Sequence, residues 1–238
     1  MNDPMSAHPP IRPSDAATLI ILNRDGGDTR VLMGKRHSDS AFMPGKYVFP
    51  GGRVDVADCR LRPAADLDPA VADKLMVRMR GCPSPARARG LAMAAVRETF
   101  EEVGLIVGTQ TPDQPRTRSV PWRTFLDTGY APDLSGLRYF ARAITPPGRP
   151  RRFDTRFFVL DAAHVVNAAA PAKVTEELLD PCWLRLDEAA QLELPNITKD
   201  ILTRLKAALE LEDREALRPG APLPFQYVRA KSWIIETI

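Results

Sequence analysis

The sequence predicts an α/β fold, on three observations. Short apolar runs between turn residues predict strands, and longer segments with apolar residues at helical spacing predict helices. With 238 residues, 44% hydrophobic and 26% charged, the chain has the length and composition of a globular protein with a sizeable core. Neither a repeat nor a convincing linker divides it. We therefore expect a flexible leader over residues 1–14 and one α/β domain over 15–238.

The first expected strands form a hairpin. The apolar run 16–22 predicts a buried strand, and the turn sequence NRDGGD joins it to a second strand over 30–36. A short strand within 46–55 ends at Pro50-Gly51-Gly52. The later expected strands are 105–108, 137–145 paired with 154–161 across a basic loop, a strand beginning near 181, and strands within 224–238.

Five helices are expected, one of which directly follows the strand within 181–189. Residues 69–80 follow an Asp cap, have Pro in the first turn and end at a glycine, which are helix start and stop signals. Residues 86–103 and the amphipathic segment 198–211 predict longer helices, and 120–129 predicts a short one. Trp122, Phe125 and Tyr130 are expected to pack in the core, with stacking on a nucleotide base as the alternative.

The charge balance points to an anionic substrate. Of 33 basic residues 26 are arginine, whose fork binds phosphate in a bidentate manner. The alternative is a dispersed arginine surface that serves solubility. Three widely spaced cysteines fit neither a disulfide framework nor a zinc knuckle, and the start of the chain has no secretory pattern, so a cytoplasmic location is expected. We expect no membrane association.

One stretch, RETFEEVGL over 97–105, concentrates negative charge. Glu98, Glu101 and Glu102 stand at i, i+3 and i+4, so they share one helix face although like charges repel there. Two explanations would account for this repulsion being tolerated: a solvated surface on which Arg97 bridges the carboxylates, or a bound cation that neutralises them. An apolar stripe lies opposite, and the glutamates are therefore expected to face away from the core; the stripe is Val96, Phe100 and Val103.

Together with GGRVDVAD upstream, this stretch resembles the Nudix box, G-x5-E-x7-R-E-U-x-E-E-x-G-U, where U is a bulky apolar residue. The matching positions are Gly52, Arg97, Glu98, Glu101, Glu102, Gly104 and Leu105. Asp58 replaces the first glutamate, and Thr99 stands at a U position. The spacer between Asp58 and Arg97 has 38 residues in place of seven, so about 31 residues are inserted.

The resemblance implies the Nudix fold, an α/β/α sandwich with a mixed central sheet, here with a helical insertion at about 59–90. A long insertion at this point is typical of coenzyme A diphosphohydrolases, and 144–160 and 194–205 resemble segments of that branch. The insertion is expected to loop out beside the active site. Its apolar residues would then contact the neutral arm of coenzyme A; they are Leu75, Met76, Val77 and Met79.

The resemblance also implies the chemistry. A hydrolase of this family cleaves the diphosphate linkage of a nucleoside diphosphate derivative with Mg²⁺ or Mn²⁺, ions that prefer carboxylate oxygens. Glu98, Glu101 and Glu102 would be metal ligands, with the carbonyl of Gly52 as a further one. Arg97 would orient the carboxylates. The catalytic base would be Glu177 or a glutamate of the box itself, such as Glu98.

The expected substrate-binding residues are Arg149, Arg151, Arg152 and Arg156, in and beside the basic loop. An enzyme acting on coenzyme A or acyl-coenzyme A is the leading interpretation. Hydrolases of ADP-ribose, NADH or dinucleoside polyphosphates remain open, and so does a non-catalytic Nudix-fold ligand sensor. Dispersed arginines show no nucleic-acid stripe, so nucleic acid is not expected as a partner. A homodimer stays open.

Overall fold

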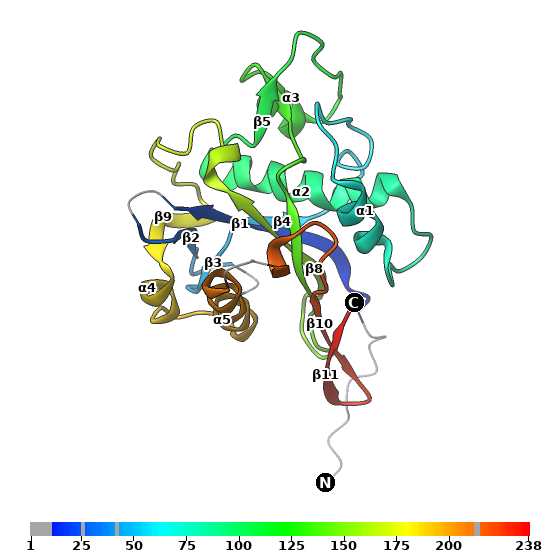
Figure 1. Cartoon of the computed structure of the whole chain (residues 1–238), viewed down its shortest axis with the longest axis vertical. Coiled ribbons are helices and arrows are strands. Elements are labelled where there is room, and N and C mark those ends of the chain that lie inside the picture. The colour runs from blue at the N-terminus through cyan, green and yellow to red at the C-terminus, as the bar shows by residue number, and fades with distance from the viewer. Residues whose placement is uncertain (1–10, 25–26, 41–42, 212–214) are drawn as a thin grey trace.

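The computed structural model describes residues 11–24, 27–40, 43–211 and 215–238. Its main feature is a mixed sheet of nine strands in the order β11-β10-β7-β8-β1-β2-β3, with β4 on β1 and β9 on β2 (Figure 1). The strands are β1 Ser14–Asn23, β2 Arg30–Arg36, β3 Tyr47–Val48, β4 Gly51–Arg53, β7 Arg138–Ile144, β8 Phe153–Asp161, β9 Leu178–Arg185, β10 Pro224–Arg229 and β11 Ser232–Thr237. A separate two-stranded sheet pairs β5 Gly108–Gln110 with β6 Tyr130–Pro132.

Helices cover both faces of the main sheet, as the α/β/α expectation requires. One layer holds α1 Pro69–Met76, α2 Pro85–Val103 and α3 Val120–Leu126; the other holds α4 Leu186–Ala190 and α5 Asn196–Glu210 (Figure 1). Short 3₁₀ turns occur at Ala162–His164 and Glu215–Leu217. Two separate apolar clusters fill the space between the layers. The expected α/β/α architecture with a mixed central sheet is confirmed.

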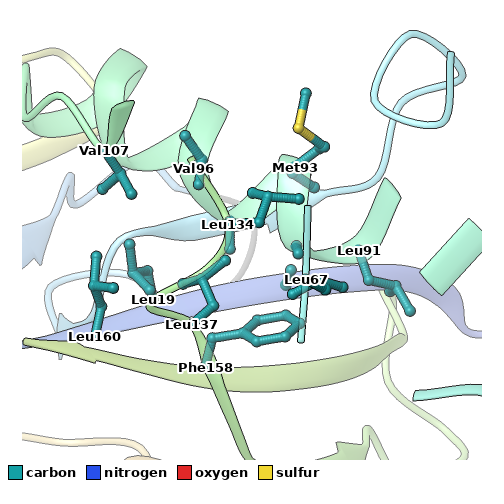
Figure 2. Packing of buried hydrophobic residues seen from close by; sticks show 14 of the residues in the cluster. Leu19, Leu67, Leu91, Met93, Val96, Val107, Leu134, Leu137, Phe158 and Leu160 are labelled. Carbon is teal, nitrogen blue, oxygen red and sulfur yellow. The ribbon is translucent and has the colours of Figure 1, made fainter. Parts of the chain in front are cut away.

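The larger apolar cluster lies under α2. Leu91 and Val96 of the helix pack toward Leu19 of β1 and Phe158 of β8 (Figure 2). These four side chains are at most 2% exposed. Burying such side chains contributes roughly 1.5–3 kcal/mol each, so this contact fixes the helix firmly on the sheet. The position of every functional group on α2 follows from it.

Local sequence explains the limits of α2. Ser84 caps its N-terminus by accepting a hydrogen bond from the N–H of Arg87, and Pro85 opens the first turn. Gly104 ends the helix in the left-handed region, at φ 72°, and donates its N–H to the carbonyl of Phe100. The expected helix over 86–103 is therefore confirmed within a residue.

The first strand lies at the centre of the sheet. It pairs in parallel with β8, and it pairs with β4 through Ala17 and Gly52. Its contact with β2 is restricted to Leu22 and Asn23 at the far end, because β1 and β2 diverge. The opening between them is filled by β4, which brings the glycine pair next to α2.

The expected leader needs a correction at its end. Residues 1–10 lie outside the described part of the chain, but β1 already begins at Ser14. Before it, the carbonyl of Ile11 accepts a hydrogen bond from Arg152, and that of Pro13 accepts one from Arg80. Residues 11–14 are thus held against the body of the protein.

Candidate functional site

Three carboxylates converge at one point. Glu98 and Glu102 from α2 meet Glu177 from the segment before β9, and each offers an oxygen within 4.8 Å of the others. Glu102 is buried, Glu98 is half-buried and Glu177 is exposed. Glu101 lies outside this trio, although it lines the same cavity. The structure therefore brings the loop glutamate expected from the sequence to two of the three helix glutamates.

The glycine pair of β4 makes room for these carboxylates. A Cβ on Gly52 would lie 2.4 Å from the carboxylate of Glu98, so a larger residue there would push this carboxylate out of its position. The N–H of Gly51 donates to Glu102 Oε2 at 2.9 Å. The expectation that all three glutamates face away from the core is wrong for Glu102, which is only 3% exposed under the glycine turn.

Arg97 holds the arrangement together. Its Nε and Nη2 donate to the two oxygens of Asp58 at 2.9 and 3.0 Å, and its Nη1 donates to Glu98 at 2.9 Å and to Glu101 at 2.6 Å. Nη2 also donates to the carbonyl of Arg53. A fully used guanidinium of this kind gives the glutamates a fixed orientation.

Asp58 is a site residue whose partners sequence reasoning missed. It is fully buried, and besides Arg97 it accepts hydrogen bonds from Trp122 Nε1 at 2.8 Å and from the N–H of Asp55. Trp122 packs in the core as expected, but it also holds Asp58. The position of Asp58 in the box pattern could have identified it as a site residue. Nothing local in the sequence links Asp58 to Trp122.

Burial governs the protonation of the trio. It raises the pKa of Glu98 to about 7, against the charge of Arg97, and Glu101 and Glu177 add to the rise. It raises the pKa of Glu102 to about 8 despite the N–H of Gly51, and Glu98 adds to the effect. For Arg97, burial opposes the charge, but the bonds to Asp58 and the charge of Glu98 hold its pKa above the ordinary value.

The first testable consequence concerns pH. Because the folded pKa values of Glu98 and Glu102 lie above the ordinary 4.5, the folded protein binds more protons than the unfolded chain between about pH 4.5 and 8. The free energy of unfolding without divalent cations should therefore fall as pH rises through this window, by about 1–2 kcal/mol per unit. Urea denaturation with EDTA at pH 6 and pH 8 measures it.

The matched control is Glu102→Gln, which removes one of the two titrating groups. The variant should lose about half of the pH dependence. An unchanged slope would show that Glu102 is not the group responsible.

The trio fits a hard divalent cation. Three carboxylate oxygens lie within reach of one ion, and burial raises the pKa of the two less exposed groups, so a cation would favour their charged forms. Gly52 leaves the space against Glu98 that a side chain would fill. Mg²⁺ and Mn²⁺ prefer this donor set, with remaining positions left to water and phosphate oxygens.

The trio lines a large cavity of about 1870 Å³, whose lining also includes Arg36, His37 and Ser40 at and after the end of β2. The cavity runs from β4 and the acidic face of α2 across the sheet to Trp233 and Ile235 of β11. The start of α5, from Asn196 to Asp200, forms one wall. Ligand pockets are typically about 300–1,000 Å³, so the space exceeds what a nucleoside diphosphate requires.

Only one of the four expected phosphate-binding arginines lines this cavity, and it is Arg151. Arg149 is exposed outside the lining. Arg152 donates instead to the carbonyls of Thr145 and Ile11. Neither of these two is placed as expected.

Arg156 requires a full correction, because it is completely buried. It donates to Asp15 at 2.7 Å and lies 3.2 Å from Asp154, which also binds the buried Arg142. Arg142 in turn donates hydrogen bonds to the carbonyls of Val77 and Arg78 in the insertion. Arg156 thus belongs to an ion-pair cluster that fastens the insertion to the sheet, out of reach of a substrate.

The insertion itself lies elsewhere than expected. All residues of 59–90 are described, and none of them lines the cavity. The expected helix over 69–80 ends at Met76, and α1 packs against α2 (Figure 1). Leu75 and Met79 are buried in the larger apolar cluster. The expected contact with a substrate arm is therefore wrong: Leu75 and Met79 form core, and Met76 and the exposed Val77 lie outside the cavity lining.

Three lysine or arginine residues that line the cavity were not expected there: Arg36, Arg53 and Lys199. Arg36, at the end of β2, pairs with Leu178 next to Glu177, and its charge favours the carboxylate form of Glu102. Its Nε is buried without a hydrogen-bond partner among the described residues. In the sequence Arg36 simply follows Lys35 at the end of an expected strand, so only the β2–β9 pairing reveals its position beside the acids.

No helix among the described residues is long and apolar enough to cross a membrane. No family model matches the chain. A Caenorhabditis elegans protein assigned as nudix hydrolase 7 is 34% identical over 206 residues, covering 80% of this chain. Acyl-coenzyme A diphosphatase NUDT19 of Gallus gallus is 30% identical over 182 residues, covering 56% of it. The chain spans 59% and 48% of the lengths of these relatives.

A crystal structure of a Nudix hydrolase from Alicyclobacillus acidocaldarius resembles the whole fold. It superposes with a TM-score of 0.60 and 28% identity, covering 82% of this chain and 92% of that one. Two sequence relatives and a solved structure thus point to the same family as the box pattern does. The chain is therefore a homologue of the Nudix hydrolases, in sequence and in fold.

Proposed function

We propose that the protein hydrolyses the diphosphate linkage of a nucleoside diphosphate derivative with the help of Mg²⁺ or Mn²⁺. The observation that carries the proposal is the convergence of Glu98, Glu102 and Glu177 within 4.8 Å in the wall of a large cavity. A bound divalent cation supplies Lewis-acid polarisation and neutralises charge on the diphosphate. Relatives named as Nudix hydrolases support this reaction class.

The residues of the chain would divide the work. Glu98 and Glu102 hold the cation, and Arg97 with Asp58 fixes their orientation. Arg36 and Arg151 line the cavity with positive charge and would bind phosphate oxygens. Glu177 is the solvent-facing member of the trio, and we assign it the role of accepting the proton of the attacking water.

The substrate that fits best is coenzyme A or an acyl-coenzyme A. One relative is named an acyl-coenzyme A diphosphatase, and the cavity has room for an arm beyond the diphosphate. Water would attack one phosphorus of the bridge and release 3′,5′-ADP and a 4′-phosphopantetheine product.

A substrate panel tests the proposal. Coenzyme A, acyl-coenzyme A, ADP-ribose, NADH and dinucleoside polyphosphates are assayed with Mg²⁺ and with Mn²⁺. Coenzyme A derivatives should be cleaved with the highest kcat/KM, and EDTA should abolish turnover. No cleavage of any diphosphate with either cation would favour a ligand sensor and overturn the proposal.

Glu177→Gln tests the assignment of the base. Loss of a general base costs about 10²–10⁴-fold, so kcat at saturating Mg²⁺ should fall by about a hundredfold or more. The matched control is Glu176→Gln, since Glu176 also lines the cavity but lies outside the trio. It should stay within about threefold of the wild type. If raising the Mg²⁺ concentration restores the Glu177→Gln variant fully, Glu177 is a metal ligand and not the base.

A further inference from the structure

The floor of the cavity is a row of residues that crosses the sheet. Ala16 of β1 pairs with Thr155 of β8, which pairs with Ala143 of β7, which pairs with Gln226 of β10, which pairs with Ile235 of β11. All five side chains line the cavity. At the opposite end Ala16 pairs with β4, whose glycines contact Glu98 and Glu102. The acidic end and the β11 end therefore belong to one continuous groove.

The strand spacing gives the length of this groove. Neighbouring strands lie about 4.7–4.9 Å apart, and five such steps separate β4 from β11, which makes about 24 Å. The hairpin of β10 and β11 extends the sheet well away from α2 in Figure 1. A substrate whose diphosphate lies at the acidic end must be long to reach the hairpin.

The chemistry of the floor changes along its length. Between the ends it carries no charge, and its polar groups are the hydroxyl of Thr155 and the amide of Gln226, which hydrogen-bonds Asp200 of α5. Such a floor suits an extended neutral arm with amide groups. The far end is apolar: Trp233 and Ile235 are 63% and 58% exposed, and Ile197 of α5 lines the same cavity.

We propose that β11 binds the acyl group of an acyl-coenzyme A, with the pantetheine arm lying along the row from Ala16 to Gln226. This inference rests on the proposed diphosphate hydrolysis and adds the residues that set its substrate preference. Trp233 and Ile235 expose apolar surface to solvent in the free protein, and an acyl chain lying on them removes that surface from water.

The test compares coenzyme A with its acetyl, hexanoyl and decanoyl thioesters. A fully buried methylene is worth about fourfold, and partial exposure reduces this, so kcat/KM should rise at least about tenfold from acetyl to decanoyl. The double variant Trp233→Thr/Ile235→Thr should keep the rate on free coenzyme A within about twofold. Its gain from acetyl to decanoyl should shrink to less than about threefold.

A control substitution on the same strand tests whether the double variant acts through misfolding. Both test residues are more than half exposed, and threonine keeps the β-branched preference of a strand. Ile234 lies between them, outside the cavity lining. Ile234→Thr should retain the chain-length gain of the wild type.

Calorimetric titration of decanoyl-coenzyme A and coenzyme A in EDTA gives a second readout without turnover. The wild type should bind the decanoyl thioester at least about tenfold more tightly, and the double variant should not. The inference is overturned if the double variant keeps the wild-type gain from acetyl- to decanoyl-coenzyme A. It is also overturned if the double variant loses kcat/KM equally on every substrate, free coenzyme A included. Cleavage of ADP-ribose but no coenzyme A compound would also overturn it, while leaving diphosphate hydrolysis intact. If no diphosphate is cleaved, the proposed function fails and the titration alone decides the inference.

Discussion

Glu102→Gln should lower kcat/KM by about a hundredfold or more and at the same time stabilise the protein without divalent cations. The amide cannot replace the negative charge that holds the cation, so the loss persists at saturating Mg²⁺. The same change removes a carboxylate that burial disfavours, with its pKa raised to about 8. At pH 8 the free energy of unfolding in EDTA should therefore rise by about 1–3 kcal/mol.

Steady-state kinetics and urea denaturation of one preparation measure both effects. Glu101→Gln provides the comparison, because Glu101 is more exposed and lies outside the trio. It should lose about tenfold in activity, because one interaction that orients Arg97 is weakened. Full turnover of Glu102→Gln at saturating Mg²⁺ would remove Glu102 from the metal site.

Asp58→Ala should have the largest effect on stability. The substitution leaves the buried guanidinium of Arg97 without its bidentate partner and Trp122 Nε1 without an acceptor. Removing one partner of a buried ion pair costs about 3–5 kcal/mol. Activity should fall as well, since Arg97 orients Glu98 and Glu101. Thermal and urea denaturation measure the loss.

Asp55→Ala is the matched control, an exposed aspartate three residues away in the same turn. It should change the free energy of unfolding by no more than about 0.5 kcal/mol. Equal stabilities of the two variants would contradict the structural role assigned to Asp58.

Local patterns in the sequence predicted the acidic helix well. The spacing of Glu98, Glu101 and Glu102 fixes them on one face, since helical periodicity depends on neighbouring residues alone. The strands β7 and β8 and the helices α2 and α5 were also predicted, each within a few residues. Their apolar periods are strong and their limits carry caps or turn residues.

Contacts between distant segments were beyond such patterns. Trp122 and Asp58 are 64 positions apart, and only the packing of α3 against α2 brings them together. Arg36 reaches the acids through the pairing of β2 with β9. Neither contact leaves a periodic signal in the sequence.

Arg156 could have been placed correctly by a more careful reading of its strand. Alternation along β8 puts Asp154, Arg156 and Phe158 on one face, and Phe158 is core. The basic loop before the strand drew attention to its charge instead. Similarly, Leu75 and Met79 stand four positions apart, which is ordinary spacing for a helix face in the core. Both are buried in the larger apolar cluster.

Binding of Mn²⁺ tests the central claim most directly, because it asks whether Glu98 and Glu102 hold a cation at all. Electron paramagnetic resonance titration at pH 8 should show that Glu98→Gln and Glu102→Gln bind Mn²⁺ at least about tenfold more weakly than the wild type. Glu176→Gln should bind it like the wild type. Equal Mn²⁺ affinity of the wild type, Glu98→Gln and Glu102→Gln would contradict the assignment of this site.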